Sequence, residues 1–236
     1  MIKYLASIVG AVGFVAVSVP ANAVPIQSSW NLTSGATNVT ASSAEFTSGD
    51  GKTITATAYR NQSSLTANTF TPATLANLTM NGSGIGVGGL DTDNNLDNFG
   101  FFDFIVLEMP TKEWLPVQMS FSINTFFGDF LDADDYEIWG SDALFSGMQR
   151  IYNGPNSGPA LNPIDLQNNV DGLLEVSGEE FQFLYISGAV GGGSDNNDDF
   201  RIAGFVGSID VPEPATLALL GLGLIGMGVA RRRKIA

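Results

Sequence analysis

The sequence predicts an all-β fold, a single sandwich of the jelly-roll-like kind, with one apolar helix at each end of the chain. Short stretches rich in β-branched and aromatic residues alternate with turns rich in glycine, proline, asparagine and aspartate. Between the two ends, no long stretch repeats apolar residues with the 3.6-residue period of an amphipathic helix. Many short strands separated by turn residues are typical of β-sandwiches.

The first part of the chain contains a predicted β-hairpin. Residues 53–59 are β-branched and small, and Gly49-Asp50-Gly51 just before them is a turn signal. Weaker strand candidates lie at residues 28–33 and 44–47. The glycine-rich residues 82–89 lack the Gly-Lys-Ser/Thr ending of a phosphate-binding loop, and no helical pattern follows them.

Further strands are expected in the second part of the chain, at residues 99–108, 114–127, 136–139, 181–186 and 200–209. From Leu115 to Ile123 every second residue is apolar, which predicts a strand with one buried face. Residues 153–163 hold Pro155, Pro159 and Pro163 and are expected to form a loop.

The N-terminus has the features of a secretory signal peptide over residues 1–23. Lys3 precedes an apolar run at residues 5–19, which is followed by Pro20 and Ala21-Asn22-Ala23. A basic start, a short apolar run and the small residues Ala21 and Ala23 predict cleavage before Val24. The alternative is a permanent transmembrane anchor, but an anchor needs about 20 apolar residues and this run is shorter.

Residues 211–236 contain three features in a fixed order. Val211, Pro212, Glu213 and Pro214 come first, an apolar stretch over residues 215–230 follows, and Arg231, Arg232, Arg233 and Lys234 come last. Sixteen helical residues span about 24 Å, against a hydrocarbon core of about 30 Å, so the predicted transmembrane helix is short. The basic residues predict a cytoplasmic stop, which places residues 24–210 on the outer side of the membrane.

This tail resembles the PEP-CTERM sorting signal of Gram-negative bacteria. The resemblance covers about residues 211–234 and rests on the Pro-Glu-Pro, the glycine-rich apolar helix and the arginine cluster. It implies recognition by an exosortase, a membrane-embedded cysteine protease or transpeptidase that removes the tail. It also implies delivery to the cell surface or extracellular matrix, often in association with exopolysaccharide and biofilm. The alternative is a plain tail anchor that is never processed, since a helix with a basic flank needs no Pro-Glu-Pro.

The region between the two ends is strongly acidic. The chain has 10 Lys+Arg and 24 Asp+Glu, and without Lys3, the four basic tail residues and Glu213, residues 24–210 have a formal charge of 5 − 23 = −18. Such a surface repels nucleic acid and anionic headgroups, so no nucleic-acid partner is expected. It is expected to attract divalent cations or basic partners. The alternative is that the excess of acidic residues only keeps a secreted domain soluble.

The chain contains no cysteine and no histidine. Disulfides, a cysteine nucleophile, a Ser-His-Asp triad and a Cys/His zinc site are therefore excluded. Oxygen ligands favour calcium over transition metals. The hypothesis for a cofactor is thus a structural calcium ion, with no other cofactor expected.

The candidate calcium ligands lie in two acidic segments: Asp91, Asp93, Asn95 and Asp97 in one, and Asp195, Asp198 and Asp199 in the other. The first four stand at alternate positions, as in the start of a calcium loop. An EF-hand is not predicted, because Leu96 and Phe102 occupy the positions where that loop needs Gly and Glu. The alternative is a solvated acidic turn.

Two further functional classes compete with a structural role. A glycoside hydrolase needs two carboxylates about 5–9 Å apart, and the carboxylates nearest to apolar strands are Glu108, Glu137 and Glu175. A carbohydrate-binding module needs surface aromatics, for which the candidates are Trp30, Trp114, Trp139, Tyr136 and Tyr152. Sheet-surface positions explain the glutamates equally well, and core packing explains the aromatics.

The sequence therefore predicts a signal peptide (1–23), an acidic β-sandwich domain (24–210) and a sorting tail (211–236). The expected function is that of an exported, non-enzymatic protein with a structural or adhesive role linked to exopolysaccharide or biofilm. The alternatives are a carbohydrate-binding module and a glycoside hydrolase. The expected partners are the general secretion machinery, an exosortase, the inner membrane during transit, and exopolysaccharide. The expected destination is the cell surface or extracellular matrix.

Overall fold

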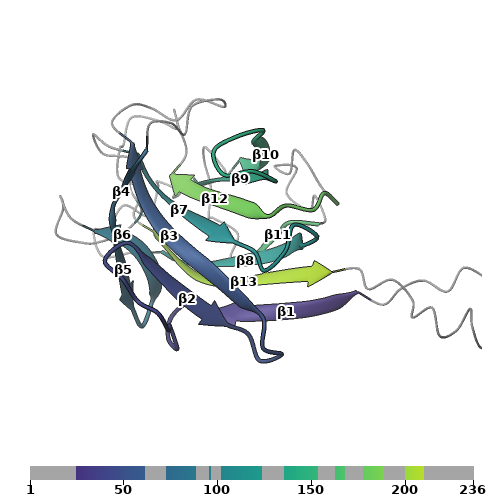
Figure 1. Cartoon of the computed structure of the whole chain (residues 1–236), viewed down its shortest axis with the longest axis horizontal. Helices are drawn as coiled ribbons and strands as arrows, with labels where there is room; N and C mark the ends of the chain where they lie inside the picture. The colour runs from purple at the N-terminus through teal and green to yellow at the C-terminus, as the bar shows by residue number, and fades with distance from the viewer. Residues whose placement is uncertain are drawn as a thin grey trace, which may run out of the picture. The chain divides into compact units, whose positions relative to one another are not determined.

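Two antiparallel β-sheets packed against each other make up the described part of the chain (Figure 1). A computed structural model describes residues 25–61, 73–88, 96, 102–123, 136–153, 163–167, 178–188 and 200–209. Every regular element within these ranges is a strand. The all-β, sandwich-like fold predicted from the sequence is therefore confirmed.

Sheet A is organised around the last strand of the chain. It contains β1 (Ile26–Asn31), β5 (Asn77–Asn81), β6 (Gly84–Gly88), β8 (Leu115–Ile123), β11 (Ile164–Asp165) and β13 (Phe200–Ile209), in the order β11-β8-β13-β6-β5. One edge of β13 pairs with β8 along nearly its whole length. The other edge is shared, because β1 pairs with the second half of β13 and β6 pairs with it at Ile202.

Sheet B has the order β10-β9-β12-β7-β3-β2, and β4 pairs with the end of β3. Its strands are β2 (Ser43–Thr47), β3 (Thr53–Asn61), β4 (Thr74–Leu75), β7 (Phe102–Glu108), β9 (Tyr136–Ser141), β10 (Gln149–Asn153) and β12 (Phe183–Gly188). Most connections between consecutive strands cross from one sheet to the other. Such crossings are common in jelly rolls and other β-sandwiches.

The core lies between the inner faces of the two sheets. Trp30 of β1 stacks on Phe205 of β13 with ring centroids 5.5 Å apart, and it meets the edge of Trp114 at 5.3 Å. From sheet B, alternate residues of each strand point inward, for example Ile54 and Ile105. This period of two is the one that a half-buried strand requires.

The glycine-rich segment at residues 82–89 contains the buried strand β6 (Gly84–Gly88), which the sequence did not predict as a strand. Gly84 has a φ of 138°, and a Cβ atom at this position would overlap the backbone oxygen of Ile202 on β13. Glycine is needed there because the backbones of β6 and β13 approach closely.

A bulge in β8 modifies the alternation that the sequence predicts. Met119 and Phe121 are buried, as expected, but the pairing with β13 shifts register between Val206 and Gly207. The extra residue on β8 is Val117, which is half-buried and faces the outer side of sheet A with Gln118. A bulge of this kind re-aims a side chain without ending the strand.

Candidate functional site

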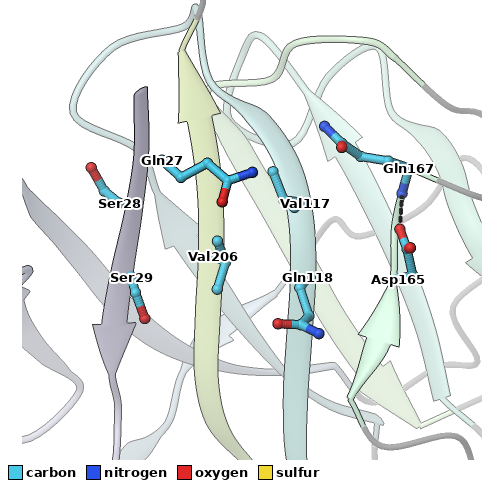
Figure 2. Close-up of a pocket in the computed structure, with 8 residues that line it drawn as sticks. All are labelled: Gln27, Ser28, Ser29, Val117, Gln118, Asp165, Gln167 and Val206. Atoms are coloured by element: carbon cyan, nitrogen blue, oxygen red, sulfur yellow. Dashed lines mark hydrogen bonds between the residues drawn. The ribbon is translucent and has the colours of Figure 1, made fainter. Parts of the chain in front are cut away.

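A polar groove crosses the outer face of sheet A (Figure 2). It has a volume of about 470 Å³ and spans β1, β13, β8 and the end of β11. Its lining residues are Gln27, Ser28, Ser29, Val117, Gln118, Asp165, Gln167 and Val206. The sequence predicted only that Gln118 lies on the polar side of its strand, and it carried no signal that strands far apart in the chain meet here.

One wall of the groove, β1, is fixed by the turn between β2 and β3. The buried Ser28 of β1 donates a hydrogen bond to Asp50 of this turn at 2.7 Å, and Ser48 donates to the other oxygen of the same carboxylate. The hydrogen bonds from Ser48 and then Ser28 hold the pKa of Asp50 below its usual value, because they favour the ionised form. The wall is therefore attached to sheet B through an ionised carboxylate.

On the opposite wall, Asp165 organises the residues that follow β11. Its Oδ1 accepts a hydrogen bond from the backbone N–H of Gln167 at 2.9 Å. β11 itself pairs with β8 through Ile164 opposite Met119 and Asp165 opposite Gln118. This pairing brings Asp165, Gln167 and Gln118 to the same side of the sheet.

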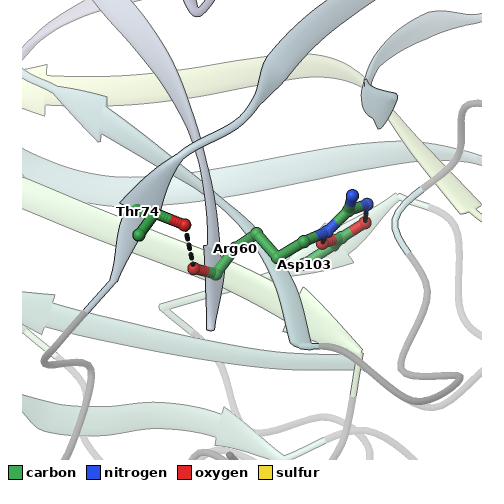
Figure 3. Close-up of polar contacts among 3 residues, drawn as sticks. All are labelled: Arg60, Thr74 and Asp103. Carbon is green, nitrogen blue, oxygen red and sulfur yellow. Dashed lines mark hydrogen bonds and ion pairs between the residues drawn. The ribbon is translucent and has the colours of Figure 1, made fainter. Parts of the chain in front are cut away.

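A second polar site is an ion pair in sheet B (Figure 3). Arg60 and Asp103 are register partners on β3 and β7, and Nε and a terminal nitrogen of the guanidinium donate to the two carboxylate oxygens at 2.6 and 2.5 Å. Thr74 of β4 donates to the backbone oxygen of Arg60 at 3.2 Å. Because Asp103 is buried and paired in this bidentate way, the arrangement fastens β3 to β7.

The outer face of sheet B carries a buried acidic residue. Glu137 of β9 accepts a hydrogen bond from the indole N–H of Trp139 at 3.1 Å, and Arg150 of β10 approaches the other oxygen at 3.2 Å. The Arg150 guanidinium also lies over the ring of Trp139, 5.5 Å from the centroid. Glu137 is thus paired with the guanidinium of Arg150 on the outer face of sheet B.

The same face also carries an aromatic cluster under the loop between β9 and β10. Phe145 of this loop meets the edge of Tyr59 at 5.1 Å, and Tyr59 stacks on Phe104 at 5.4 Å. The Tyr185 hydroxyl accepts a hydrogen bond from the backbone N–H of Phe145 at 2.8 Å and shares another with Ser141. Burial raises the pKa of Tyr185 above its usual value.

Glu108 and Glu137 do not form a glycosidase pair. Register partners show that Glu108 and Ser141 lie on either side of Phe183, and Glu137 is four residues further along the same strand as Ser141. Two strand spacings and four residues correspond to a separation of roughly 16 Å, beyond the 5–9 Å that the mechanism needs. Glu175 lies outside the described residues.

Burial favours core packing over glycan binding for the five aromatic candidates. Trp30, Trp114, Trp139, Tyr136 and Tyr152 are all buried. Tyr136 stacks on Phe121 and on Tyr152, at 4.5 and 5.6 Å. These side chains contribute to hydrophobic packing, because each ring covers part of a sheet face that would otherwise be exposed to solvent.

The seven candidate calcium ligands all lie outside the described residues. Within the described ranges, no group of three or more acidic residues is arranged to hold a metal ion. The structural calcium ion therefore stays a prediction. Calorimetry with calcium on the exported protein tests it, with binding and a higher melting temperature as the expected result.

The predicted signal peptide, its cleavage residues Ala21 and Ala23, the sorting motif at 211–214, the helix at 215–230 and the basic stop at 231–234 also lie outside the described residues. In the part of the chain that the structure describes, no helix is long and apolar enough to cross a membrane.

Comparison with known families identifies the tail. Residues 210–234 match the family model of the PEP-CTERM protein-sorting motif. The chain thus joins a sandwich-like β body to a C-terminal tail that matches a sorting motif, as the resemblance predicted. The motif implies export and recognition by an exosortase. No curated protein and no solved structure matches the chain.

Proposed function

We propose that residues 24–210 form a non-enzymatic structural or adhesive component of the cell surface or extracellular matrix, linked to exopolysaccharide. The observation that carries this proposal is the position of the sorting motif. Its match begins at residue 210, directly after the last strand of the sandwich ends at Ile209. The motif therefore follows the folded body without a long linker.

The ends of the sandwich support this arrangement. Ile26 at the start of β1 is the register partner of Ile209 at the end of β13. The chain consequently enters and leaves the body at the same point of sheet A. Removal of a signal peptide before Val24 and of a tail after residue 210 leaves the strand pairing intact.

The position of β13 suits a tethered protein. β13 is an interior strand, with β8 on one edge and β1 and β6 on the other. A force along the strand from its C-terminal end loads the hydrogen bonds to both edges in shear, so many bonds must break together. An edge strand peeled from one end would instead lose its hydrogen bonds one at a time.

In this proposal the secretion machinery exports the chain, and the helix at 215–230 holds it in the inner membrane during transit. An exosortase then acts at the tail, and the acidic sandwich reaches the surface or the matrix of a Gram-negative cell. The separation of Glu108 from Glu137 makes this particular pair unsuited to glycosidase chemistry.

Mass spectrometry of the protein from a host with and without its exosortase tests the proposal. The expected result is a mature form that begins at Val24 and lacks the basic tail, found at the surface or in the matrix only when the exosortase is present. Glu213→Ala should leave the chain uncleaved in the membrane fraction, whereas Glu179→Ala, an exposed acid in the body, should be processed normally. An intact C-terminus in the presence of exosortase would contradict the proposal.

A further inference from the structure

We propose that the groove on the outer face of sheet A binds a segment of neutral polysaccharide. This inference rests on the proposed link to exopolysaccharide and assigns it a site. The groove crosses four strands, which corresponds to a width of roughly 14 Å and leaves room for more than one sugar ring. Its volume of about 470 Å³ lies within the range of ligand pockets.

Three side-chain amides give the groove its chemistry. Gln27 reaches over β13 from β1, Gln118 lies on β8, and Gln167 comes from the far wall (Figure 2). Among the described residues, these three amide groups make no hydrogen bond to the protein. An amide both donates and accepts hydrogen bonds, as a sugar hydroxyl does, so the three groups are complementary to a polyol.

The charge of the groove selects against anionic ligands. Asp165 is the charged residue among the described residues that line it, and none of these is a lysine or arginine. An anionic polysaccharide would bring its carboxylates towards the Asp165 carboxylate. The body as a whole is also strongly acidic. A neutral ligand is repelled neither by Asp165 nor by the acidic body.

Two valines add an apolar strip to the groove, and this strip is complementary to the face of a sugar ring. Val206 of β13 is the register partner of Gln118 on β8, and Val117, the extra residue of the β8 bulge, precedes Gln118 and also lines the groove (Figure 2). Sugar rings carry C–H groups on their faces as well as hydroxyls at their edges. The strip accepts the ring face, while the amides and Ser29 bind the hydroxyls at the edges.

Affinity electrophoresis tests the site with the exported protein in gels that contain dextran, hydroxyethyl cellulose or galactomannan, and with alginate as the anionic probe. We expect at least one neutral polymer to retard the protein and alginate not to do so. Each amide bond contributes about 1 kcal/mol, which is roughly a fivefold change in affinity. The variant Gln27→Ala/Gln118→Ala should therefore lose more than tenfold in affinity. Gln149→Ala, an exposed glutamine on β10 of the other sheet, is the matched control.

The possible results distinguish an error in the ligand from an error in the site. No retardation by any neutral polymer, or retardation by alginate alone, overturns the assignment of the ligand. Retardation that the double variant retains overturns the assignment of the site. Both groove residues lie on an outer face, so an unchanged melting temperature of the variant shows that any loss of binding is not a loss of folding. The processing of the tail is measured separately, so the proposed sorting can stand if the groove proposal fails.

Discussion

The outer faces of the two sheets differ in composition and in what covers them. The outer face of sheet A carries the glutamine-lined groove, in which amides and a valine strip face outward. The outer face of sheet B carries Phe104, Val106, Trp139 and Tyr185, all buried, and Phe145 and Met148 of the β9–β10 loop pack against them. Among the described residues, sheet B therefore has buried hydrophobic clusters on both sides, whereas sheet A has one on its inner side.

The difference shows that exposure cannot be inferred from strand alternation alone. The strands of sheet B have side chains on both faces that pack, and Glu137 is only 4 % exposed although it points away from the main core. Phe145 keeps its ring on this face with a φ of 59°, a strained conformation for a bulky residue, and its aromatic contacts offset the strain. We conclude that the outer face of sheet B contributes to stability, and we expect binding on the outer face of sheet A, where the described residues form the groove.

The largest expected effect contrasts one residue from each outer face. Phe104→Ala should lower the free energy of unfolding by about 3–5 kcal/mol, because it empties a fully buried site. Gln118→Ala should change it by less than about 0.5 kcal/mol. Urea denaturation of both variants measures the difference. Similar costs for the two variants would mean that the faces do not differ in this way.

Charged residues should show the same contrast, slightly smaller. Asp103→Asn removes the buried carboxylate that pairs with the Arg60 guanidinium, which is only 12 % exposed, and should cost about 3 kcal/mol. Asp165→Asn on the half-exposed wall of the groove should cost less than about 1 kcal/mol. Thermal unfolding at neutral pH measures both. A cost for Asp165→Asn as large as that for Asp103→Asn would show that the groove is structural.

Two tyrosines of the aromatic cluster separate the contribution of a hydroxyl from that of a ring. Tyr185→Phe should cost about 1–2 kcal/mol, because the backbone N–H of Phe145 loses its acceptor. Tyr59→Phe should cost less than about 0.5 kcal/mol, because no hydrogen bond to the Tyr59 hydroxyl occurs among the described residues. Denaturant titration of the pair is the measurement. Equal losses would contradict the role given to the Tyr185 hydroxyl.

The smallest expected effect concerns pH and the fixed wall of the groove. The pKa of Asp50 is lowered in the folded state, so its ionised form stabilises the fold above the ordinary value of 3.8, and this contribution disappears as the pH falls through the folded-state pKa. The melting temperature of Asp50→Asn should lie slightly below that of the natural protein at pH 6, and the difference should shrink as the pH falls below 3.8. A difference that stays constant with pH would show that ionisation of Asp50 contributes nothing.

The sequence predicted most strands of the fold but not all. The strongest segments, such as residues 53–59 and 200–209, correspond to β3 and β13, because β-branched and aromatic side chains favour a pleated, half-buried surface. The strands β4, β5, β6, β10 and β11 were missed. β6 is glycine-rich and β11 has two residues, so neither carries a side-chain pattern, and each forms because a neighbouring strand supplies its hydrogen bonds.

The sorting signal of this protein could be recognised from the sequence by itself. A sorting motif acts as a linear signal of adjacent residues, and the family match to residues 210–234 agrees with the order of motif, apolar stretch and basic residues. The acidic charge and the lack of cysteine and histidine are likewise properties of composition.

Only the tertiary structure decided which side chains share a surface. The groove joins Gln27, Gln118 and Gln167, which are far apart in the chain and meet because β13 pairs with both β1 and β8 and β11 pairs with β8. The aromatic residues that a sequence offers as a binding surface are buried here, because the loop between β9 and β10 folds over one face and the two sheets close over the other. Such contacts depend on strand register and sheet order, which arise from long-range pairing rather than from local preference.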